Sequence, residues 1–198
     1  FGEGDYYYKG DVTKWKKFGN SLLLKLGIAI ADSNNSLAQA VVTEAISGGV
    51  FTSIADNCQL PYQTASPNYN PIYDALVASG RDDYIAAAPF VNFLLENSDP
   101  RISSYYQLNE DDEYVGQEVG QPGEVDVFSR IGTFAEQPDF PGVILNYTEV
   151  AFYLAEAAAR WGISDAATAY NNAVLASLSE WNVSAEDATA YLTAHPYN

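Results

Sequence analysis

The chain has 198 residues, of which 26 are acidic and 9 are basic, so its formal net charge at pH 7 is −17. This length predicts one domain, and an apolar share of 47% is sufficient for a hydrophobic core. A charge this negative repels phosphate groups and argues against binding to nucleic acid or to anionic lipid.

Two helices are expected in the N-terminal part, residues 1–49. Residues 12–31 carry apolar side chains every three or four positions behind Asp11, a suitable N-cap. A second helix is expected over residues 36–47, ending at Gly48-Gly49, so that the two form an antiparallel hairpin. The side chains predicted to face inward are Trp15, Phe18, Leu22, Leu26 and Ile30 in the first helix and Leu37, Val41 and Ala45 in the second.

The middle of the chain, residues 50–147, is expected to be a mostly irregular insertion. It holds eight of the nine prolines and more than half of the tyrosines. One helix is predicted over residues 89–97, and a small strand hairpin over residues 103–107 and 113–119. Val143-Ile144-Leu145 is interpreted as a buried run. A long structured loop inside a helical domain commonly serves binding, so we expect the functional site here.

Helical periodicity returns in residues 148–198. One helix is predicted over residues 148–161 and ends at Gly162, and another follows Ser164 as its cap. A short third helix is predicted from Ser184, where Ser184-x-x-Asp187 resembles a capping box.

The second helix of each pair has the same spacing of small and large residues, namely Ala38-x3-Val42-x2-Ala45 and Ala166-x3-Tyr170-x2-Ala173. Small residues allow two helices to approach closely, as in tetratricopeptide hairpins. The sequence therefore predicts a mainly all-α fold, with tetratricopeptide-like helix hairpins around a long, loop-rich insertion.

The single cysteine and the single histidine exclude several kinds of site. Cys58 has no partner for an internal disulfide or a cysteine-based metal cluster, and we interpret it as a passive thiol. His195 alone cannot form a histidine metal cage, and its place near the C-terminus argues against a histidine-dependent triad. The longest apolar run, residues 26–31, is too short to cross a membrane.

Charged residues are unevenly distributed. Residues 1–25 hold five lysines and three acids, net +2, whereas the remaining residues hold four arginines and 23 acids, net −19. The basic segment is interpreted as a solvated helix face, or alternatively as a contact patch for an acidic partner. The acidic turn of residues 110–113 is interpreted as solvated, with Ca²⁺ binding as the alternative, although its spacing differs from an EF-hand. No other cofactor is expected.

Tyrosines crowd the insertion, with asparagine and arginine nearby. An exposed aromatic ring covers the apolar face of a sugar, while amide and guanidinium groups bond its hydroxyls. The alternative is that the tyrosines fill a helix-poor core. Asp99-Pro100-Arg101 is interpreted as a structural pair, and Gly80-Arg81-Asp82-Asp83-Tyr84 as a similar turn or a ligand contact.

Five segments, in order, resemble motifs of the SusD/RagB family of nutrient-binding outer-membrane lipoproteins. Residues 8–22 are similar to the family's "Y-x-G-D-x-x-K-W-x-K-F-A-N-S-L" helix, and residues 44–49 to its "E-A-I-x-G-G" helix end. Residues 70–84 resemble "N-P-L-Y … R-x-D-Y", residues 99–101 match "D-P-R", and residues 145–157 resemble "L-x-Y-A-E-V-x-F-L-L-A-E-A".

The resemblance implies a protein on the extracellular face of the outer membrane, held by an N-terminal lipid anchor absent from this chain. It implies capture of an oligosaccharide or a peptide and delivery to a SusC-like TonB-dependent transporter, without enzymatic chemistry. Family members are much longer than 198 residues, which implies that this chain lacks N- and C-terminal parts. The absence of an initiator methionine also predicts a processed or longer protein.

The candidate ligand-binding residues combine this chemistry with position in the insertion; they are Tyr69, Asn70, Tyr73, Arg81, Tyr105 and Tyr106. Two other functions stay open from the residues alone. A tetratricopeptide-like scaffold would bind another protein in a groove lined by the helix hairpins. A glycoside hydrolase would need only two suitably spaced carboxylates.

Overall fold

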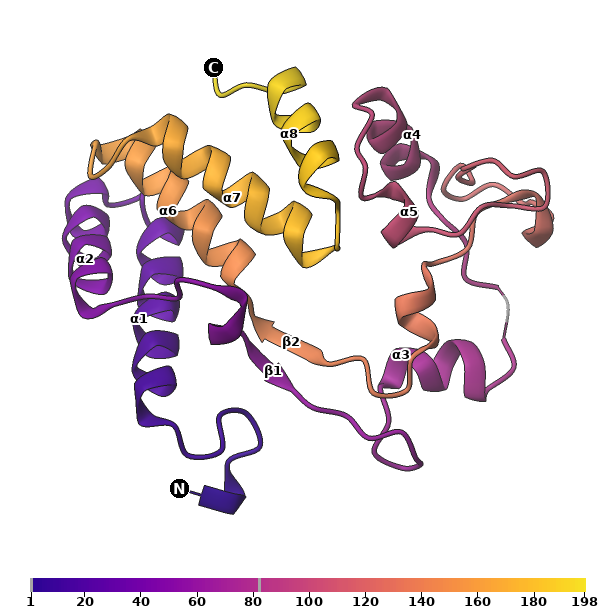
Figure 1. Cartoon of the computed structure of the whole chain (residues 1–198), viewed down its shortest axis with the longest axis horizontal. Helices are drawn as coiled ribbons and strands as arrows, with labels where there is room; N and C mark the ends of the chain where they lie inside the picture. The colour runs from indigo at the N-terminus through magenta and orange to yellow at the C-terminus, as the bar shows by residue number, and fades with distance from the viewer. Residues whose placement is uncertain (1, 82) are drawn as a thin grey trace. The chain divides into compact units, whose positions relative to one another are not determined.

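The computed structural model describes residues 2–81 and 83–198, and Asp82 of the predicted turn lies outside this part. The chain divides into two compact units. The helical unit comprises Phe1–Leu60, Val143–Glu180 and Leu192–Asn198, and the loop-rich unit comprises Pro61–Gly142 and Trp181–Tyr191. The fold is mainly helical, which confirms the predicted class (Figure 1).

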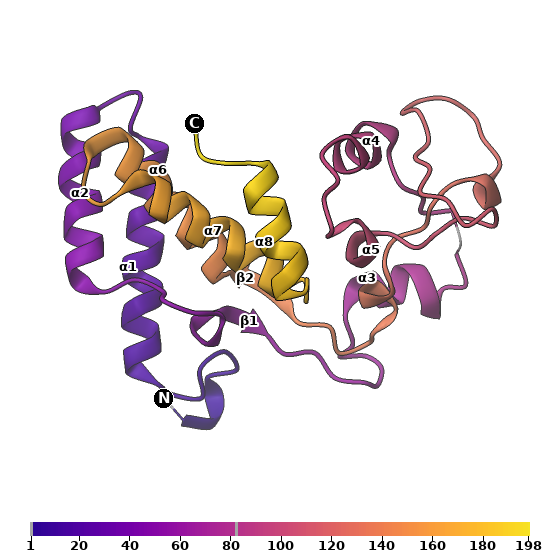
Figure 2. The same ribbon diagram turned by 45° about the horizontal axis from the view of Figure 1, so that its top comes forward.

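The helical unit is built from two helix pairs. Helices α1 (Val12–Ala29) and α2 (Asn35–Gly48) form one antiparallel pair, and α6 (Tyr147–Trp161) and α7 (Ala166–Glu180) form the other (Figures 1 and 2). Helix α1 also contacts α6. The remaining elements connected to this unit are the 3-10 turns η1 (Gly2–Gly4) and η2 (Ile54–Asp56) and the paired strands β1 (Cys58–Leu60) and β2 (Gly142–Leu145). Most residues of helix α8 (Ala185–Ala194) belong to the loop-rich unit.

Side-chain caps explain where these helices begin. The carboxylate of Asp11 accepts hydrogen bonds from the amides of Thr13 and Lys14, as predicted. Helix α7 is capped by Asp165, which accepts from the Thr168 amide at 2.8 Å, so the predicted cap at Ser164 is wrong by one residue. A carboxylate satisfies a free amide more strongly than a hydroxyl does.

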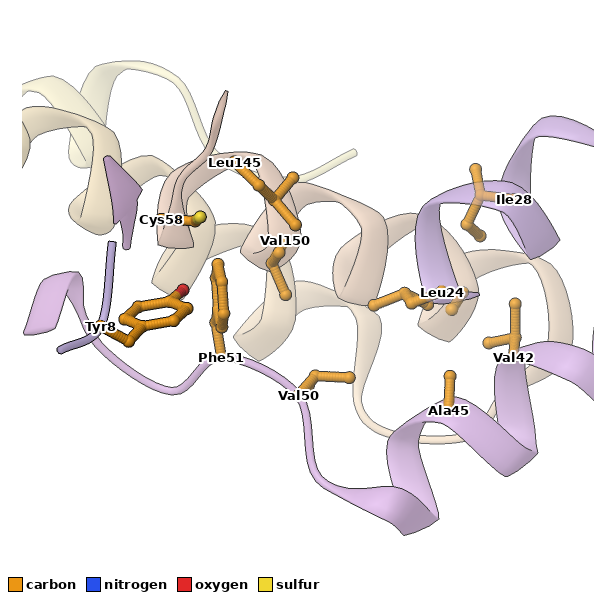
Figure 3. Close-up of a cluster of buried hydrophobic side chains, with 11 residues drawn as sticks. Tyr8, Leu24, Ile28, Val42, Ala45, Val50, Phe51, Cys58, Leu145 and Val150 are labelled. Carbon is orange, nitrogen blue, oxygen red and sulfur yellow. The ribbon is translucent and has the colours of Figure 1, made fainter. Parts of the chain in front are cut away.

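Close contact between α1 and α2 organises the core of the helical unit. Ala38, Val42 and Ala45 are completely buried, as the small-large-small spacing predicts. A Cβ atom on Gly27 would lie only 2.7 Å from Cγ2 of Val42, so glycine is required at this crossing. Beside this contact, buried side chains from α1, α2, α6 and the connecting segments pack together (Figure 3), including Tyr8, Leu24, Phe51, Leu145 and Val150.

The predicted inward faces of the first two helices are only partly correct. Leu22 and Leu26 are 39% and 55% exposed, and Leu37 of α2 is 50% exposed. The buried residues of α1 are instead Ser21, Leu24, Gly27 and Ile28. Two of them, Ser21 and Gly27, are small residues that a search for an apolar stripe does not include. Ser21 also has a polar partner, since its Oγ accepts a hydrogen bond from the Phe51 amide.

The loop-rich unit contains short helical segments joined by irregular chain. They are α3 (Pro71–Tyr73), continued by the wider turn η3 (Asp74–Ala78), then α4 (Ala88–Glu96), α5 (Ile102–Tyr105), η4 (Val125–Val127) and η5 (Thr133–Glu136). Helix α4 is close to its predicted range, and its buried residues are Val91 and Leu94.

The predicted strand hairpin is wrong, although its turn is present. Residues 102–105 are helical, and Tyr106 forms a bridge with Ile131. The turn forms because Asn109 Oδ1 accepts hydrogen bonds from the amides of Asp111 and Glu113. The run Val143-Ile144-Leu145 is a strand, but only Leu145 is buried.

Asp99 and Arg101 form the structural pair that the sequence predicts. Asp99 is 1% exposed and accepts hydrogen bonds from the amide and the Nε of Arg101, at 3.0 and 2.9 Å. Burial raises the pKa of Asp99, but the Arg101 guanidinium and amide outweigh it and hold this pKa below its ordinary value. The charge is therefore kept inside the unit by its partner.

Replacing Asp99 by Ala should destabilise the protein by about 3 kcal/mol, because the Arg101 charge would lose its buried partner. Urea unfolding measures this as a lower midpoint. Asp83→Ala is a matched control, since Arg81 and Asp83 also stand two residues apart but have side chains that are 56% and 53% exposed. Equal midpoints for the two variants would contradict a special role for the buried pair.

Asp5 anchors the N-terminal loop through hydrogen bonds from neutral donors. Its Oδ1 accepts from the amides of Tyr7 and Tyr8, and its Oδ2 accepts from the Gly10 amide and the Trp15 indole. Burial alone would raise the pKa of Asp5, but these hydrogen bonds outweigh it and lower the pKa from 3.8 to about 2.

Because the folded-state pKa is lowered, the contribution of Asp5 to stability is complete above its ordinary pKa and is lost as pH falls from 3.8 through about 2. Asp5→Asn should lower the urea midpoint at neutral pH, since an amide NH₂ would face two other donors. This difference from the parent chain should disappear in strong acid. A difference that persists unchanged there would show that charge is not its cause, and Asp139→Asn, at an exposed position, is the control.

Candidate functional site

Two of the predicted tyrosines form a pair at the start of the helical segment α3–η3. The rings of Tyr69 and Tyr73 lie 5.3 Å apart, edge to face at 70°, and both are partly exposed. Tyr69 donates its hydroxyl to Oδ1 of Asp74 at 2.9 Å, and this bond raises the pKa of Tyr69. The tyrosine pair thus places aromatic ring surface next to the carboxylate of Asp74 and the hydroxyl of Tyr69.

Asn70 lies between these tyrosines but has a different role. It is 5% exposed, its Oδ1 caps α3 by accepting from the Ile72 amide, and its Nδ2 donates to the Phe140 carbonyl at 2.6 Å. The Asn70 backbone amide also donates to the Pro138 carbonyl. Because these bonds fix the chain on both sides of Asn70, it positions the tyrosine pair, and the structure gives its side chain a structural role.

Arg81 contributes to a small hollow elsewhere in the loop-rich unit, whose apolar lining residues are Leu76, Val77 and Ile131. It forms a two-bond ion pair with Asp83, at 2.9 and 2.6 Å, and its guanidinium lies 5.2 Å from the Tyr84 ring centre. The hollow has a volume of about 70 Å³. Besides Arg81 and Tyr84, its polar lining residues are Gln107, Arg130 and Glu136. We refer to it as the arginine hollow.

Tyr105 and Tyr106 belong to an aromatic cluster that packs the unit. Tyr105 stacks on Phe90 at 5.9 Å and meets the edge of Trp181 at 4.7 Å, while Tyr106 contacts Phe90 at 6.2 Å. Burial raises the pKa of Tyr106. These contacts match the alternative in which tyrosines fill a helix-poor core, and they leave less ring surface for a ligand.

The six candidate residues therefore fall into three groups. Tyr69, Asn70 and Tyr73 are together, Arg81 lies in the arginine hollow, and Tyr105 and Tyr106 lie in the aromatic cluster. Gln107, Arg130 and Glu136 are not among the predicted site residues, because only folding brings them to the same hollow as Arg81. Tyr84 is one of the tyrosines that crowd the insertion and stands three residues after Arg81 in the sequence, and both features point to it.

The helical unit has two larger hollows that the sequence analysis did not identify. One, of about 670 Å³, is bounded by Asp5, Tyr6, Tyr7, Val12 and Trp15. Among its described lining residues the carboxylate is that of Asp5, whose oxygens already accept four hydrogen bonds from the protein. The other, of about 630 Å³, lies between α2, α6 and α7, with Ile46 and Leu154 among its apolar residues.

The basic segment is largely used inside the helical unit. Lys17 donates to both carboxylate oxygens of Asp56, at 2.9 and 2.8 Å, and Lys25 donates to Glu149 at 2.6 Å. Lys14 donates to the Ala55 carbonyl at 2.7 Å. These bonds attach α1 to neighbouring segments and favour a structural role over a contact patch for an acidic partner.

The described residues also bear on binding of cations and on membranes. Within residues 2–81 and 83–198, no three His, Cys, Asp or Glu side chains are grouped so as to hold a metal ion. The acidic turn of residues 110–113 is included in this statement. In the same residues, no helix has both the length and the hydropathy required to cross a bilayer.

Solved structures similar to this chain are SusD homologues. A SusD homologue from Bacteroides uniformis is 26% identical with a TM-score of 0.82, over 98% of this chain and 41% of that one. A SusD-like protein from Bacteroides thetaiotaomicron is 30% identical with a TM-score of 0.76, over 96% and 40%. A chitin-binding SusD homologue from Flavobacterium johnsoniae is 28% identical with a TM-score of 0.78, over 95% and 39%.

The chain thus spans less than half the length of these relatives. A search of curated proteins finds no match. The sequence profile of the SusD-like family, described as "Starch-binding associating with outer membrane", matches residues 1–198. A match over the whole chain, together with the similar solved structures, shows that this chain belongs to the SusD-like family.

Proposed function

We propose that the protein binds an oligosaccharide at the bacterial cell surface, with the tyrosine pair as one contact surface. The observation that carries this proposal is the edge-to-face pair of Tyr69 and Tyr73, fixed by the buried amide of Asn70. Partly exposed rings cover the C–H face of a sugar, and the nearby Asp74 carboxylate accepts hydrogen bonds from hydroxyl groups. The chitin-binding homologue and the family description support a glycan ligand.

A rigid base makes such a contact effective. Side chains that are already ordered lose less entropy when a ligand binds. The bonds of Asn70 to the Ile72 amide and the Phe140 carbonyl hold the tyrosine pair in place before binding. The chemistry proposed is capture alone, with no bond made or broken, in accord with the binding proteins that the chain resembles.

Replacing both Tyr69 and Tyr73 by Ala should weaken oligosaccharide binding about tenfold or more, because two ring faces are lost. The measurement is titration calorimetry of the full chain with a starch-derived and a chitin-derived oligosaccharide. Tyr6→Ala is the control, because Tyr6 is 64% exposed and lies in the helical unit. If the double variant binds as tightly as the parent chain, the tyrosine pair is not a contact surface. If the parent chain binds neither class of sugar, the proposed function is contradicted for these glycans.

The whole protein is proposed to act on the outer face of the outer membrane, held there by a lipid anchor, and to deliver its ligand to a SusC-like TonB-dependent transporter. Gentle detergent extraction of the native envelope, followed by capture of the full-length protein, should co-elute a large barrel protein. Elution with soluble partners alone would contradict delivery through a barrel.

A protein-binding scaffold is the second candidate. The observation that favours it is the hollow of about 630 Å³ between α2, α6 and α7, since a scaffold of helix hairpins requires such a groove. Here the hydroxyls of Thr43 and Ser47 donate to carbonyls of their own helix, which leaves an apolar surface near Ile46 and Leu154. Soluble partners in the extraction experiment would favour this function.

A further inference from the structure

The arginine hollow contains both hydrogen-bond donors and acceptors. Gln107 Nε2 donates to the Ile131 carbonyl and to Glu136 Oε1, both at 2.8 Å. The amide oxygen of Gln107 and the second carboxylate oxygen of Glu136 have no hydrogen bond to any residue in the described chain. Of the guanidinium nitrogens, Arg81 Nη1 and Arg130 Nη1 are likewise unused by those residues.

The charges of the hollow disfavour an anion. Arg81 is paired with Asp83, and Arg130 with Asp126 at 3.0 Å, whereas Glu136 has no cationic partner among residues 2–81 and 83–198. The three carboxylates outnumber the two guanidinium groups, so the local charge is negative, as is the charge of the whole chain. An anionic ligand that entered the hollow would be repelled by the carboxylate of Glu136.

The same arrangement suits hydroxyl groups. A hydroxyl donates one hydrogen bond and accepts others, so adjacent hydroxyls need acceptors and donors side by side. A volume of about 70 Å³ holds a few groups of that size, since a water molecule in the liquid takes ~30 Å³, but it does not hold a whole sugar ring. Tyr84, 45% exposed, adds an aromatic ring at the same place.

We propose that the arginine hollow reads neighbouring hydroxyl groups of a neutral sugar and discriminates against acidic sugars. Glu136 and Gln107 accept from the hydroxyls, and Arg81 and Arg130 donate to them. This inference rests on the proposed glycan-binding function and deepens it, because it names uncharged saccharides as the ligand class. Arg81, a candidate from the sequence, thereby acquires a defined role.

Glu136→Gln tests the proposal, because it preserves side-chain shape while replacing a charged acceptor by an amide. Binding of the neutral oligosaccharide by the full chain should weaken about tenfold, since hydrogen bonds to charged groups contribute ~1.5–3 kcal/mol. The ratio of the affinity for the neutral sugar to the affinity for an oligouronate of equal length should fall as well, because the substitution removes the charge of Glu136 that repels an acidic sugar. Glu124→Gln, in the same unit but outside the hollow, makes the same charge change and should have no effect.

The outcomes separate the two proposals. If the parent binds a neutral oligosaccharide and Glu136→Gln binds it equally well, the role of the hollow is overturned while glycan binding stands. A parent that prefers the oligouronate likewise overturns the inference alone. A parent that binds neither sugar overturns the proposed function and this inference with it. Thermal unfolding of each variant checks that the substitution leaves the fold intact.

Discussion

In the loop-rich unit, buried polar side chains satisfy the backbone groups that a sheet would otherwise pair. Asn70 joins the Ile72 amide to the Phe140 carbonyl, and Asp99 holds the amide and guanidinium of Arg101. Ser129, also completely buried, accepts from the Val115 amide. An unsatisfied backbone group costs free energy when buried, so irregular chain remains folded only where such partners exist. The positions of the candidate site depend on these anchors.

These buried hydrogen bonds also show which side chains have a structural role and which are left exposed to a ligand. Asn70 is chemically suited to bond a sugar, yet both of its polar atoms are used inside the chain. Its neighbours Tyr69 and Tyr73 keep partly exposed rings because Asn70 holds their backbone. Tyr105 is partly exposed as well, but Phe90 and Trp181 contact its ring. A residue type that suits a ligand becomes available only where packing leaves it exposed.

The pairing of charged groups also affects which side chains are available to a ligand. The chain carries 26 acidic residues and 9 basic ones, so most carboxylates lack a cationic partner. Lys17, Lys25 and the four arginines form ion pairs with carboxylates. The ion pairs of Lys17 with Asp56 and of Lys25 with Glu149 join separate segments of the helical unit, whereas Arg101 pairs with Asp99 within one segment. In the arginine hollow, Asp83 and Asp126 neutralise the guanidinium charges of Arg81 and Arg130, so the negative charge of Glu136 is not neutralised. Neutral polar ligands suit such a surface better than anions.

The sequence by itself determined the mainly helical class, the two helix pairs, most helix ends and the Asp99–Arg101 pair, because caps, glycine stops and spacing are local signals. Ordered motifs over most of the chain also indicated the family. Only the tertiary structure decided which face of α1 is buried, since Gly27 and Ser21 are inward for reasons that lie in α2 and in Phe51. It also decided that residues 103–107 bond to residues 130–132 rather than to the next strand, and that Gln107, Arg130 and Glu136 meet Arg81. Contacts between residues far apart in the chain produce no periodic pattern in the sequence, so they cannot be predicted from local sequence signals.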